Sequence, residues 1–371
     1  MAITSFTDAR ISQGIATLYA GQAAVAQLVS EANETLVDQV NPAGSIVKDF
    51  LPLSDGATGT LTRNTPETAS GTQNIVPVTF NMYEYGLGSD AVTFPWREFL
   101  TRAENPEAYQ KVIESVANKA ITAGDILGTI PLRDTIAAGT NATYVHPLGP
   151  DNGSTQWTSP TASKLVRYGT QAATRAARAD ITTADLITWP WIQSMKMELR
   201  TRHARPIAAQ LGTPIYAVIA HGHILNDILT SLIATAVYPN LLDSSMRMRL
   251  AELGIGISLV GLFDGVLLIE SDRMVYTAAG ADGINVYPVA MVGADFLAHA
   301  GLAPSAMPQK PADGDLINVG PGACVIVQPS YGGVHSNRTG TAAWYSYQGF
   351  GIFDAKSYIR VECASTSAGR I

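Results

Sequence analysis

The pattern of apolar and polar positions predicts one long helix with particular clarity. Asn105-Pro106-Glu107 supplies a cap acceptor, a proline whose missing N–H costs nothing, and an acid near the positive end of a helix. A stripe at helical spacing follows, made of Tyr109, Val112, Ile113, Val116, Ala120, Leu127 and Ile130. We therefore predict a helix over about residues 106–130, roughly six turns long.

Other stripes at helical spacing predict further helices in the first half of the chain. Residues 8–40 carry an interrupted, alanine-rich stripe, which indicates one or two helices that need a partner surface to be stable. Two more helices are expected over Ser163–Ala179 and Thr183–Arg202, each with a hydroxyl side chain at its start as a cap.

The second half of the chain is dominated by apolar runs that predict strands. Ile215–Ala220 is expected to be a strand that leads into a helix over Leu225–Ala234, whereas the run around His299, FLAHAGL, is helix-like. The carboxyl-terminal segment is expected to form two strands with a break at Gly349–Gly351. Further strand-like segments are GISLVGLFDGVLLIES, GINVYPVAMVGADF and ACVIVQPS. With helices early and strands late, the predicted fold class is mixed α+β.

A polar stretch over Ser54–Asn74 interrupts the apolar patterns. Leu61 is its only large apolar side chain, and Gly, Thr, Ser, Asn and Pro dominate, so the stretch cannot build a core of its own. The sequence on both sides is strand-like, which favours a long protruding hairpin. The following segment, residues 75–94, is expected to form one or two strands with a break at Gly86–Gly88.

The composition indicates that much of the protein surface is covered by other subunits. Of the 371 residues, 46% are hydrophobic, but only 15% are charged, against the roughly 25% usual for soluble domains. A monomer in water usually keeps its surface charged, and interface cores are depleted in charge. The net charge of -7 argues against a dedicated nucleic-acid binder, although it does not exclude a locally basic face.

The remaining bulk features favour a soluble protein made in a cytosol. Cys324 and Cys363 lie far apart and fit neither a disulfide framework nor a set of zinc ligands. The amino-terminal residues lack the basic start and apolar core of a secretory signal. The most apolar stretch, Leu253–Phe263, is too short to span a bilayer.

No sequence motif for a common enzyme class is present. The chain has no P-loop and no Gly-x-Ser-x-Gly elbow, and Gly254-Ile255-Gly256 lacks the third glycine of a dinucleotide-binding turn. The carboxylates are scattered singly rather than paired in an apolar setting. We therefore expect no enzyme, no catalytic or cofactor-binding residue and no cofactor.

The stretch IYAVIAHGHILND, residues 215–227, has two interpretations. His221 and His223 share a face of a continuing strand and could chelate a metal, as in barrel hydrolases that present imidazoles at strand ends. Such a site needs further ligands, and neither His299 nor His335 follows an apolar strand end. The alternative is a strand-to-helix turn through Gly222, with Asn226 and Asp227 starting the helix and His221 bonded to a nearby backbone group. We favour the turn and expect no metal.

The one basic region also has two interpretations. Between Lys164 and Arg205 there are eight Lys or Arg and three acids, Asp180, Asp185 and Glu198. These cations form either a solvated helix face with acidic partners or a surface that meets a polyanion through its phosphates, whatever the base sequence.

Several segments taken together resemble the major capsid protein family of tailed bacteriophages. They are ELRTRHARPI, the stretch YAVIAHGHILND, LFDGVLLIES, and the ending GTAAWYSYQGFGIFDAKSYIRVE. Their order and spacing are similar to the family's, over about three quarters of the chain. The family has His-Pro at the strand end where this chain has His221-Gly222. Some members cross-link through a lysine in the extended loop, but Ser54–Asn74 contains Arg63 and no lysine.

This resemblance implies the shared coat fold of tailed phages, with four parts. Residues 1–53 would be the N-arm and residues 54–82 the extended loop. Residues 83–180 and 331–371 would form a peripheral domain around the long spine helix, and residues 181–330 an axial domain.

The resemblance also implies a function and a set of partners. The protein would assemble with itself into pentamers and hexamers of an icosahedral shell, made in the host cytoplasm and found in the virion. Scaffold and portal proteins would take part in assembly, and packaged double-stranded DNA would be contacted non-specifically. Whether a decoration protein binds is left open, and no membrane is expected as a partner. The alternatives are an encapsulin-like nanocompartment shell and, in a different class, a metal-dependent hydrolase that uses His221 and His223.

Overall fold

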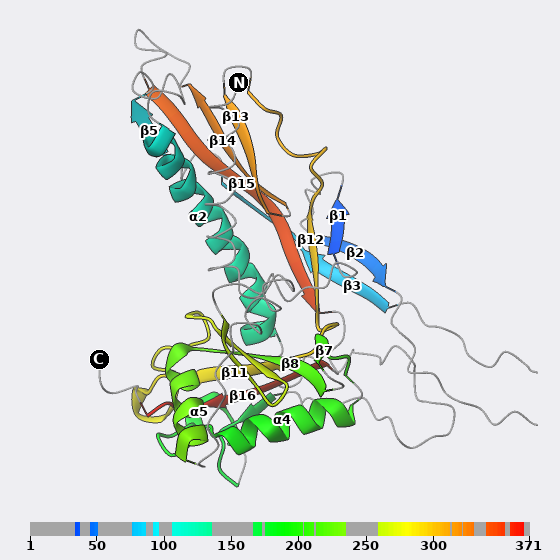
Figure 1. Ribbon diagram of the computed structural model, residues 1–371, viewed down its shortest axis with the longest axis vertical. Coiled ribbons are helices and arrows are strands. Elements are labelled where there is room, and N and C mark those ends of the chain that lie inside the picture. The colour runs from blue at the N-terminus through cyan, green and yellow to red at the C-terminus, as the bar shows by residue number, and fades with distance from the viewer. Residues whose placement is uncertain are drawn as a thin grey trace, which may run out of the picture.

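Two β-sheets joined by one long helix organise the protein (Figure 1). The structure is a computed structural model. It describes residues 34–37, 45–50, 76–86, 92–95, 106–135, 166–172, 175–202, 204–210, 213–234, 259–311, 314–320, 322–329, 339–352 and 357–366.

The first sheet is built around one long strand, β15, which spans Thr339–Ile352. Successive parts of β15 pair antiparallel with β14 and β12, and also with β5 and β4. One end of the sheet carries β13, paired with β14, and the other carries β1, paired parallel with β12. The bounds of the partner strands are β1 Glu34–Val37, β4 Tyr83–Gly86, β5 Val92–Pro95, β12 Leu297–Leu302, β13 Asp315–Gly320 and β14 Ala323–Pro329.

The helix α2, Pro106–Ile130, runs lengthwise against this sheet, and a π-helical turn over Pro131–Thr135 extends it (Figure 1). Its apolar stripe meets the inward side chains of β13, β14 and β15, so helix and sheet bury one another. The residues of this cluster include Ile113, Val116, Ala120, Val319, Val325, Val327, Ala342 and Trp344. The stripe that predicted the helix is therefore also the surface that holds it.

The second sheet lies at the carboxyl end of α2 and has the order β6-β16-β11-β8-β10-β9, with β7 paired to β8. Helices α4, Trp189–Thr201, and α5, Gly222–Ala234, contribute to the apolar cluster on one face. The other face packs against the end of α2 through Leu127 and Leu132. The strand bounds are β6 Val166–Tyr168, β7 Ala208–Gln210, β8 Thr213–Ala220, β9 Leu259–Phe263, β10 Val266–Glu270, β11 Tyr287–Val292 and β16 Tyr358–Cys363.

A two-stranded antiparallel ribbon stands beside the first sheet (Figure 1). It consists of β2, Ser45–Phe50, and β3, Val76–Asn81, with Phe50 opposite Val76. The two strands thus flank the polar stretch as the sequence predicted, while Ser54–Asn74 itself lies outside the described residues.

Several sequence predictions are confirmed. The helix over residues 106–130, the strand ending at Ala220 and the helix ending at Ala234 are all present. The segments GISLVGLFDGVLLIES, GINVYPVAMVGADF and ACVIVQPS contain β9 and β10, β11 and β14. The α+β class is confirmed as well.

Other predictions are wrong, mostly because long-range pairing overrides local spacing. Ser163–Ala179 is not a helix, since Val166–Tyr168 pairs with β16. Glu34–Val37, within the predicted amino-terminal helices, is a strand, and so is the run around His299. The remaining residues of 8–40 lie outside the described residues.

Two predicted boundaries are also wrong. The helix expected from Thr183 begins at Trp189, because Asp185 is drawn into a hydrogen-bonded turn with Thr182. The break expected at Gly349–Gly351 does not occur, because β12 pairs with these residues and β15 continues to Ile352.

The strand pairing also groups the elements differently from the predicted domain ranges. Strands β12, β13 and β14, placed within 181–330, pair in the sheet beside α2. Strand β16, placed within 331–371, pairs in the other sheet. Within the described residues, no helix is long and apolar enough to cross a membrane.

Gly86 offers a test of how tightly β4 lies against β15. It has φ +99°, and a Cβ there would stand 1.8 Å from the Trp344 carbonyl oxygen. We expect Gly86→Ala to lower the free energy of unfolding by more than about 2 kcal/mol, from left-handed strain plus the clash. Urea unfolding measures the loss. The control is Gly283→Ala, with φ +72° and nothing near its Cβ, which should cost only about 1 kcal/mol. Equal losses would contradict the close approach.

Candidate functional site

The carboxyl end of α2 is held by side chains from the second sheet. The Tyr358 hydroxyl donates to the Leu132 carbonyl at 2.5 Å, and Arg360 Nη1 donates to the same oxygen at 3.3 Å and to the Arg133 carbonyl. The Tyr276 hydroxyl also donates to the Arg133 carbonyl. A helix leaves its last carbonyls without partners and carries partial negative charge at that end. A cationic donor is therefore the partner that this helix end favours.

Arg360 and Glu362 form the buried core of this junction. Arg360 is 1% exposed and Glu362 is fully buried, with Arg360 Nε 3.2 Å from Glu362 Oε1. Burial by itself would lower the pKa of Arg360, but Tyr358, Glu362 and Tyr276 outweigh it and the pKa is raised. The guanidinium therefore stays charged although it is removed from water.

Arg178 completes the junction from the basic region. It binds Glu362 with two bonds, Nε to Oε2 at 2.6 Å and Nη2 to Oε1 at 2.9 Å, the fork geometry that suits a carboxylate. Its guanidinium also lies 3.3 Å from the centre of the Tyr276 ring. Burial would lower the pKa of Arg178, but Glu362 and the neighbouring tyrosines raise it overall.

Asp185 organises the loop that leads into α4. Its carboxylate accepts from the backbone N–H groups of Thr182 at 2.9 Å, Thr170 at 3.1 Å and Gln171 at 3.3 Å, and from Arg175 Nε at 3.0 Å. Burial opposes the charge, but the hydrogen bonds from Thr182, Gln171 and Thr170 prevail and lower the pKa of Asp185.

Six of the eight cations of the basic region have acidic or aromatic partners, and a seventh, Lys164, lies outside the described residues. Ion pairs join Arg175 to Asp185, Arg178 to Glu362, Lys196 to Asp264, Arg202 to Glu198 and Arg205 to Asp295. Arg167 lies over the Trp191 ring at 4.6 Å. This arrangement favours a face with acidic partners over a surface dedicated to a polyanion.

The residues around His221 form the strand-to-helix turn that we favoured from the sequence. The strand ends at Ala220, the chain turns at His221, and α5 begins at Gly222. His221 Nδ1 accepts from the His223 backbone N–H at 3.2 Å, as expected for a histidine bonded to a nearby backbone group. Gly222 lets the Glu270 side chain lie close to the turn, because a Cβ there would stand 2.3 Å from Glu270 Oε1 and would displace it.

One detail of that turn was predicted wrongly. Asn226 and Asp227 do not start the helix but lie inside it, because α5 begins four residues before Asn226. Asp227 instead reaches the end of the chain, where its carboxylate accepts from Ser365 Oγ at 2.7 Å and from the Thr366 backbone N–H at 3.0 Å.

The described residues do not support a metal at His221 and His223. The two rings stack with centres 4.9 Å apart, and one ring nitrogen of His221 is already used by the backbone. No group of three His, Cys, Asp or Glu suited to a metal occurs in the part of the chain that the structure describes.

Both cysteines are buried free thiols. Burial raises the pKa of Cys324 to about 11, and burial with nearby carboxylates raises that of Cys363 further above its ordinary value. Since the thiolate is the reactive form, both behave as small core residues.

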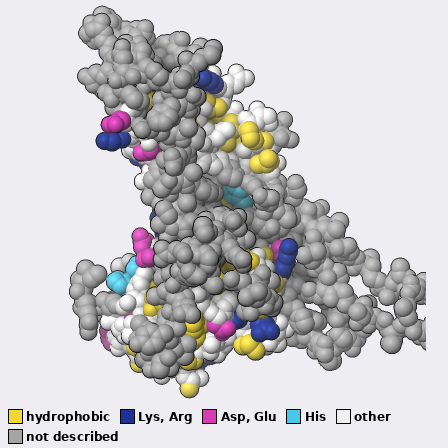
Figure 2. Space-filling view, in the orientation of Figure 1, with side chains coloured by type: hydrophobic (Ala, Val, Ile, Leu, Met, Phe, Trp, Pro, Cys, Tyr) yellow, Lys and Arg dark blue, Asp and Glu magenta, His cyan; other side chains and the backbone are white. Residues whose placement is uncertain are grey.

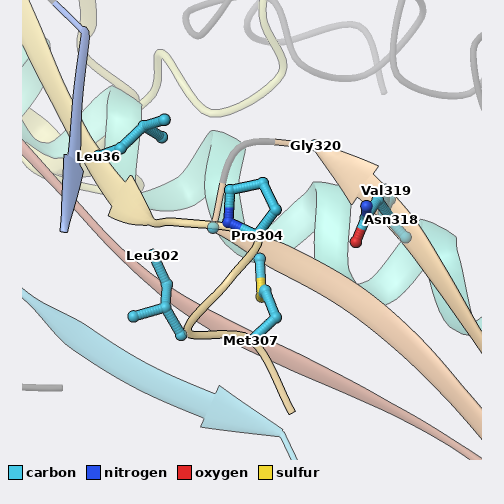
Figure 3. A pocket seen from close by; sticks show the side chains of 8 residues that line it. Leu36, Leu302, Pro304, Met307, Asn318, Val319 and Gly320 are labelled. Atoms are coloured by element: carbon cyan, nitrogen blue, oxygen red, sulfur yellow. The ribbon is translucent and has the colours of Figure 1, made fainter. Parts of the chain in front are cut away.

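An apolar edge lies at the β1 end of the first sheet. Leu36 on β1 and Val47 on β2 are 55% and 61% exposed. Beside Leu36 is a pocket of about 480 Å³ between β12 and β13 (Figure 3). Figure 2 shows hydrophobic side chains gathered over β1 and the segment after β12. The pocket is lined by Leu36, Leu302, Pro304, Met307, Asn318, Val319, Gly320 and Gly322.

The junction was not among the features predicted from the sequence, although a signal for it is present there. Arg360 and Glu362 alternate with apolar residues in Tyr358–Cys363, so both point to the same face of a buried strand. Two opposite charges on one face of such a strand indicate a buried ion pair. Their partners, Arg178 and the carbonyls at the end of α2, are too distant in sequence to be found from spacing.

The similarity of this chain to known proteins is found by comparing structures and not by comparing sequences. No protein-family model matches this chain, and no curated protein matches it. The capsid of Ralstonia phage GP4 is similar, with 14% identity and a TM-score of 0.55 over 91% of this chain and 87% of that one. The chain thus has the coat fold of a tailed-phage capsid protein, as the sequence resemblance predicted.

Two further structures are more weakly similar. The capsid of cyanophage P-SCSP1u has 12% identity and a TM-score of 0.49 over 91% of this chain and 87% of that one. The holo-SrpI encapsulin complex from Synechococcus elongatus has 10% identity and a TM-score of 0.47 over 91% and 89%.

Removing the Arg360 charge should destabilise the protein strongly. We expect Arg360→Met to lower the free energy of unfolding by roughly 3–5 kcal/mol, because the buried Glu362 loses one cation and the α2 carbonyls lose a donor. Urea unfolding measures this loss. As a control, Arg205→Met breaks a pair whose arginine is half exposed and should cost less than about 1 kcal/mol. A loss at Arg360 no larger than at Arg205 would show that the junction contributes little.

Asp185 should add an acid-sensitive contribution to stability. Its pKa is lowered by folding, so the stabilisation is present above the unfolded value near 3.9 and is lost as pH falls through the folded value. Asp185→Asn should remove this part of the pH dependence below about pH 5, as followed by urea midpoints. A variant whose midpoints fall with pH as steeply as those of the wild type would refute the assignment.

Proposed function

We propose that this protein is the major capsid protein of a tailed phage, which assembles with itself into an icosahedral head shell around a double-stranded DNA genome. The observation that carries the proposal is the coat fold over nearly the whole chain. The protein acts as a structural subunit of the virion rather than as an enzyme. It would take part in pentamers and hexamers made in the host cytoplasm.

The distribution of surface chemistry supports self-assembly. Only 15% of the residues are charged, and Leu36 and Val47 expose apolar side chains on elements that stand at one side of the first sheet. Among the described residues, the strand β1 pairs only with β12 and ends the sheet, so its outer edge offers backbone groups to a neighbour. A second copy of this chain is therefore the proposed partner of this surface, which comprises the β1 edge, the pocket beside it and the β2–β3 ribbon.

The four parts of the coat fold are proposed over the ranges that the sequence resemblance implies, except for the four strands β12, β13, β14 and β16. Residues 1–53 form the N-arm, 54–82 the extended loop, 83–180 and 331–371 the peripheral domain, and 181–330 the axial domain. The pairing of β12–β14 with β15 favours moving these strands to the peripheral domain, and the pairing of β16 with β11 favours moving β16 to the axial one.

The remaining partners follow from the proposed role. Scaffold and portal proteins assist assembly, a decoration protein binds outside where one exists, and packaged DNA is contacted without sequence preference. The basic region is not proposed as a dedicated DNA surface, because five of its eight cations are paired with acids.

Electron microscopy of the expressed protein, with and without a scaffold, tests the proposal. Closed icosahedral particles are expected, and a monomer under every assembly condition would contradict it. The cargo distinguishes the proposed shell from an encapsulin-like compartment, since particles from infected cells should contain DNA rather than an enzyme.

A charge placed on the apolar edge should reduce assembly. We expect Leu36→Asp and Val47→Asp each to lower the yield of closed particles at least about tenfold, because a carboxylate would be buried against a neighbouring subunit. Particle yield is measured by sedimentation. The matched control is Asn226→Asp, which adds the same charge at an exposed position of α5 and should assemble normally. Normal yields from both edge variants would exclude this edge as a subunit contact.

A further inference from the structure

The first turn of α5 is capped by an imidazole. The His221 carbonyl accepts the Leu225 N–H at 3.1 Å, which makes His221 the capping residue, and its Nδ1 accepts the His223 N–H at 3.2 Å. A ring nitrogen accepts a hydrogen bond only when it carries no proton. The usual capping residues, Ser, Thr, Asn and Asp, keep their acceptor near neutral pH, whereas a histidine loses its acceptor on protonation.

The surroundings of His221 act on its charge in opposing directions. The His223 ring lies 4.9 Å away in a stacked arrangement, and Tyr287 on β11 lies 5.2 Å from the His221 ring. Two acids at the end of β10 lie nearby: Glu270 stands against Gly222, and Asp272 favours a cation at His221. The positive end of α5 disfavours a cation at the same place.

The balance holds His221 neutral. Burial is the largest effect and His223 the second, and together they outweigh Asp272, so the pKa of His221 is lowered from its ordinary value of 6.5. The cap is therefore complete above about pH 6.5, the unfolded value, and is lost as pH falls through the folded value.

We propose that His221 makes the first turn of α5 a pH-sensitive element, in which one proton on Nδ1 removes the cap acceptor and opens the turn. The new charge then faces the positive end of the helix and His223, so the turn cannot close around it. The opening is confined to the first turn, because the second is anchored by Asp227 to Ser365 and Thr366. This inference does not depend on the proposed shell function.

Hydrogen exchange of the purified full-length chain tests the proposal. The protection factors of the His223, Ile224 and Leu225 amides, corrected for the intrinsic effect of pH, should fall about fivefold to tenfold from pH 7.5 to 5, the loss expected for a missing cap. In His221→Asn, whose side chain caps at every pH in this range, they should change less than twofold. His223→Gln keeps the backbone donor and should keep the wild-type fall.

Two results would overturn the proposal: wild-type protection that is constant over this range, or the same fall in His221→Asn. If His221→Asn does not fold, the imidazole resonances of the wild type decide instead. The pKa of His221 must then lie below its ordinary value of 6.5, and the His223 backbone amide resonance must move at the same midpoint as the His221 ring. A His221 midpoint at or above 6.5, or a His223 amide that does not follow it, contradicts the proposal.

Discussion

The arrangement of the two sheets depends on which groups donate hydrogen bonds to the backbone carbonyls at the carboxyl end of α2. A helix of this length ends in carbonyls that must find donors. Here they meet the Arg360 guanidinium and the Tyr358 phenol from β16, and the Tyr276 phenol from the segment between β10 and β11. The guanidinium of Arg360 is out of water, which would be costly if Glu362 were not beside it. Glu362 is in turn held by Arg178. The basic region, the second sheet and the long helix are thus joined by a continuous network of hydrogen bonds and ion pairs, from Arg178 through Glu362 and Arg360 to the end of α2.

The sequence predicted the elements whose local and tertiary signals agree. The helix α2 has a proline start, an acid near its positive end and a stripe that matches the sheet it covers. The strand Ile215–Ala220 is a continuous apolar run because both of its faces are covered, Ala217 and Ile219 by one cluster and Val218 and Ala220 by the other. The histidine stretch has the predicted strand-to-helix turn, with α5 beginning at Gly222 and His221 bonded to a nearby backbone N–H.

The failures have a common physical cause. Val166–Tyr168 and Leu297–Leu302 have compositions that suit a helix as well as a strand, and only partners far along the chain decide between them. The continuation of β15 through Gly349 and Gly351 has the same origin, since β12 supplies the bonds that hold the glycines extended. The alternation of Arg360 and Glu362 indicates a buried ion pair, but their partners at the end of α2 could not be predicted, because hydrogen bonds to carbonyl oxygens leave no trace in residue type.

The strand β15 has a consequence for how the molecule carries load. Hydrogen bonds in a sheet run across the strands, so a pull along the length of β15 strains the bonds to β14, β12, β5 and β4 in shear, many at once. A pull across the sheet would instead peel them one pair at a time. Because α2 lies lengthwise against the same strand, the stiff direction of this layer is the direction in which helix and strand both run (Figure 1). The protein is therefore strongest under tension along that axis, whereas β1 at the edge of the sheet is held through only four residues, all paired with β12.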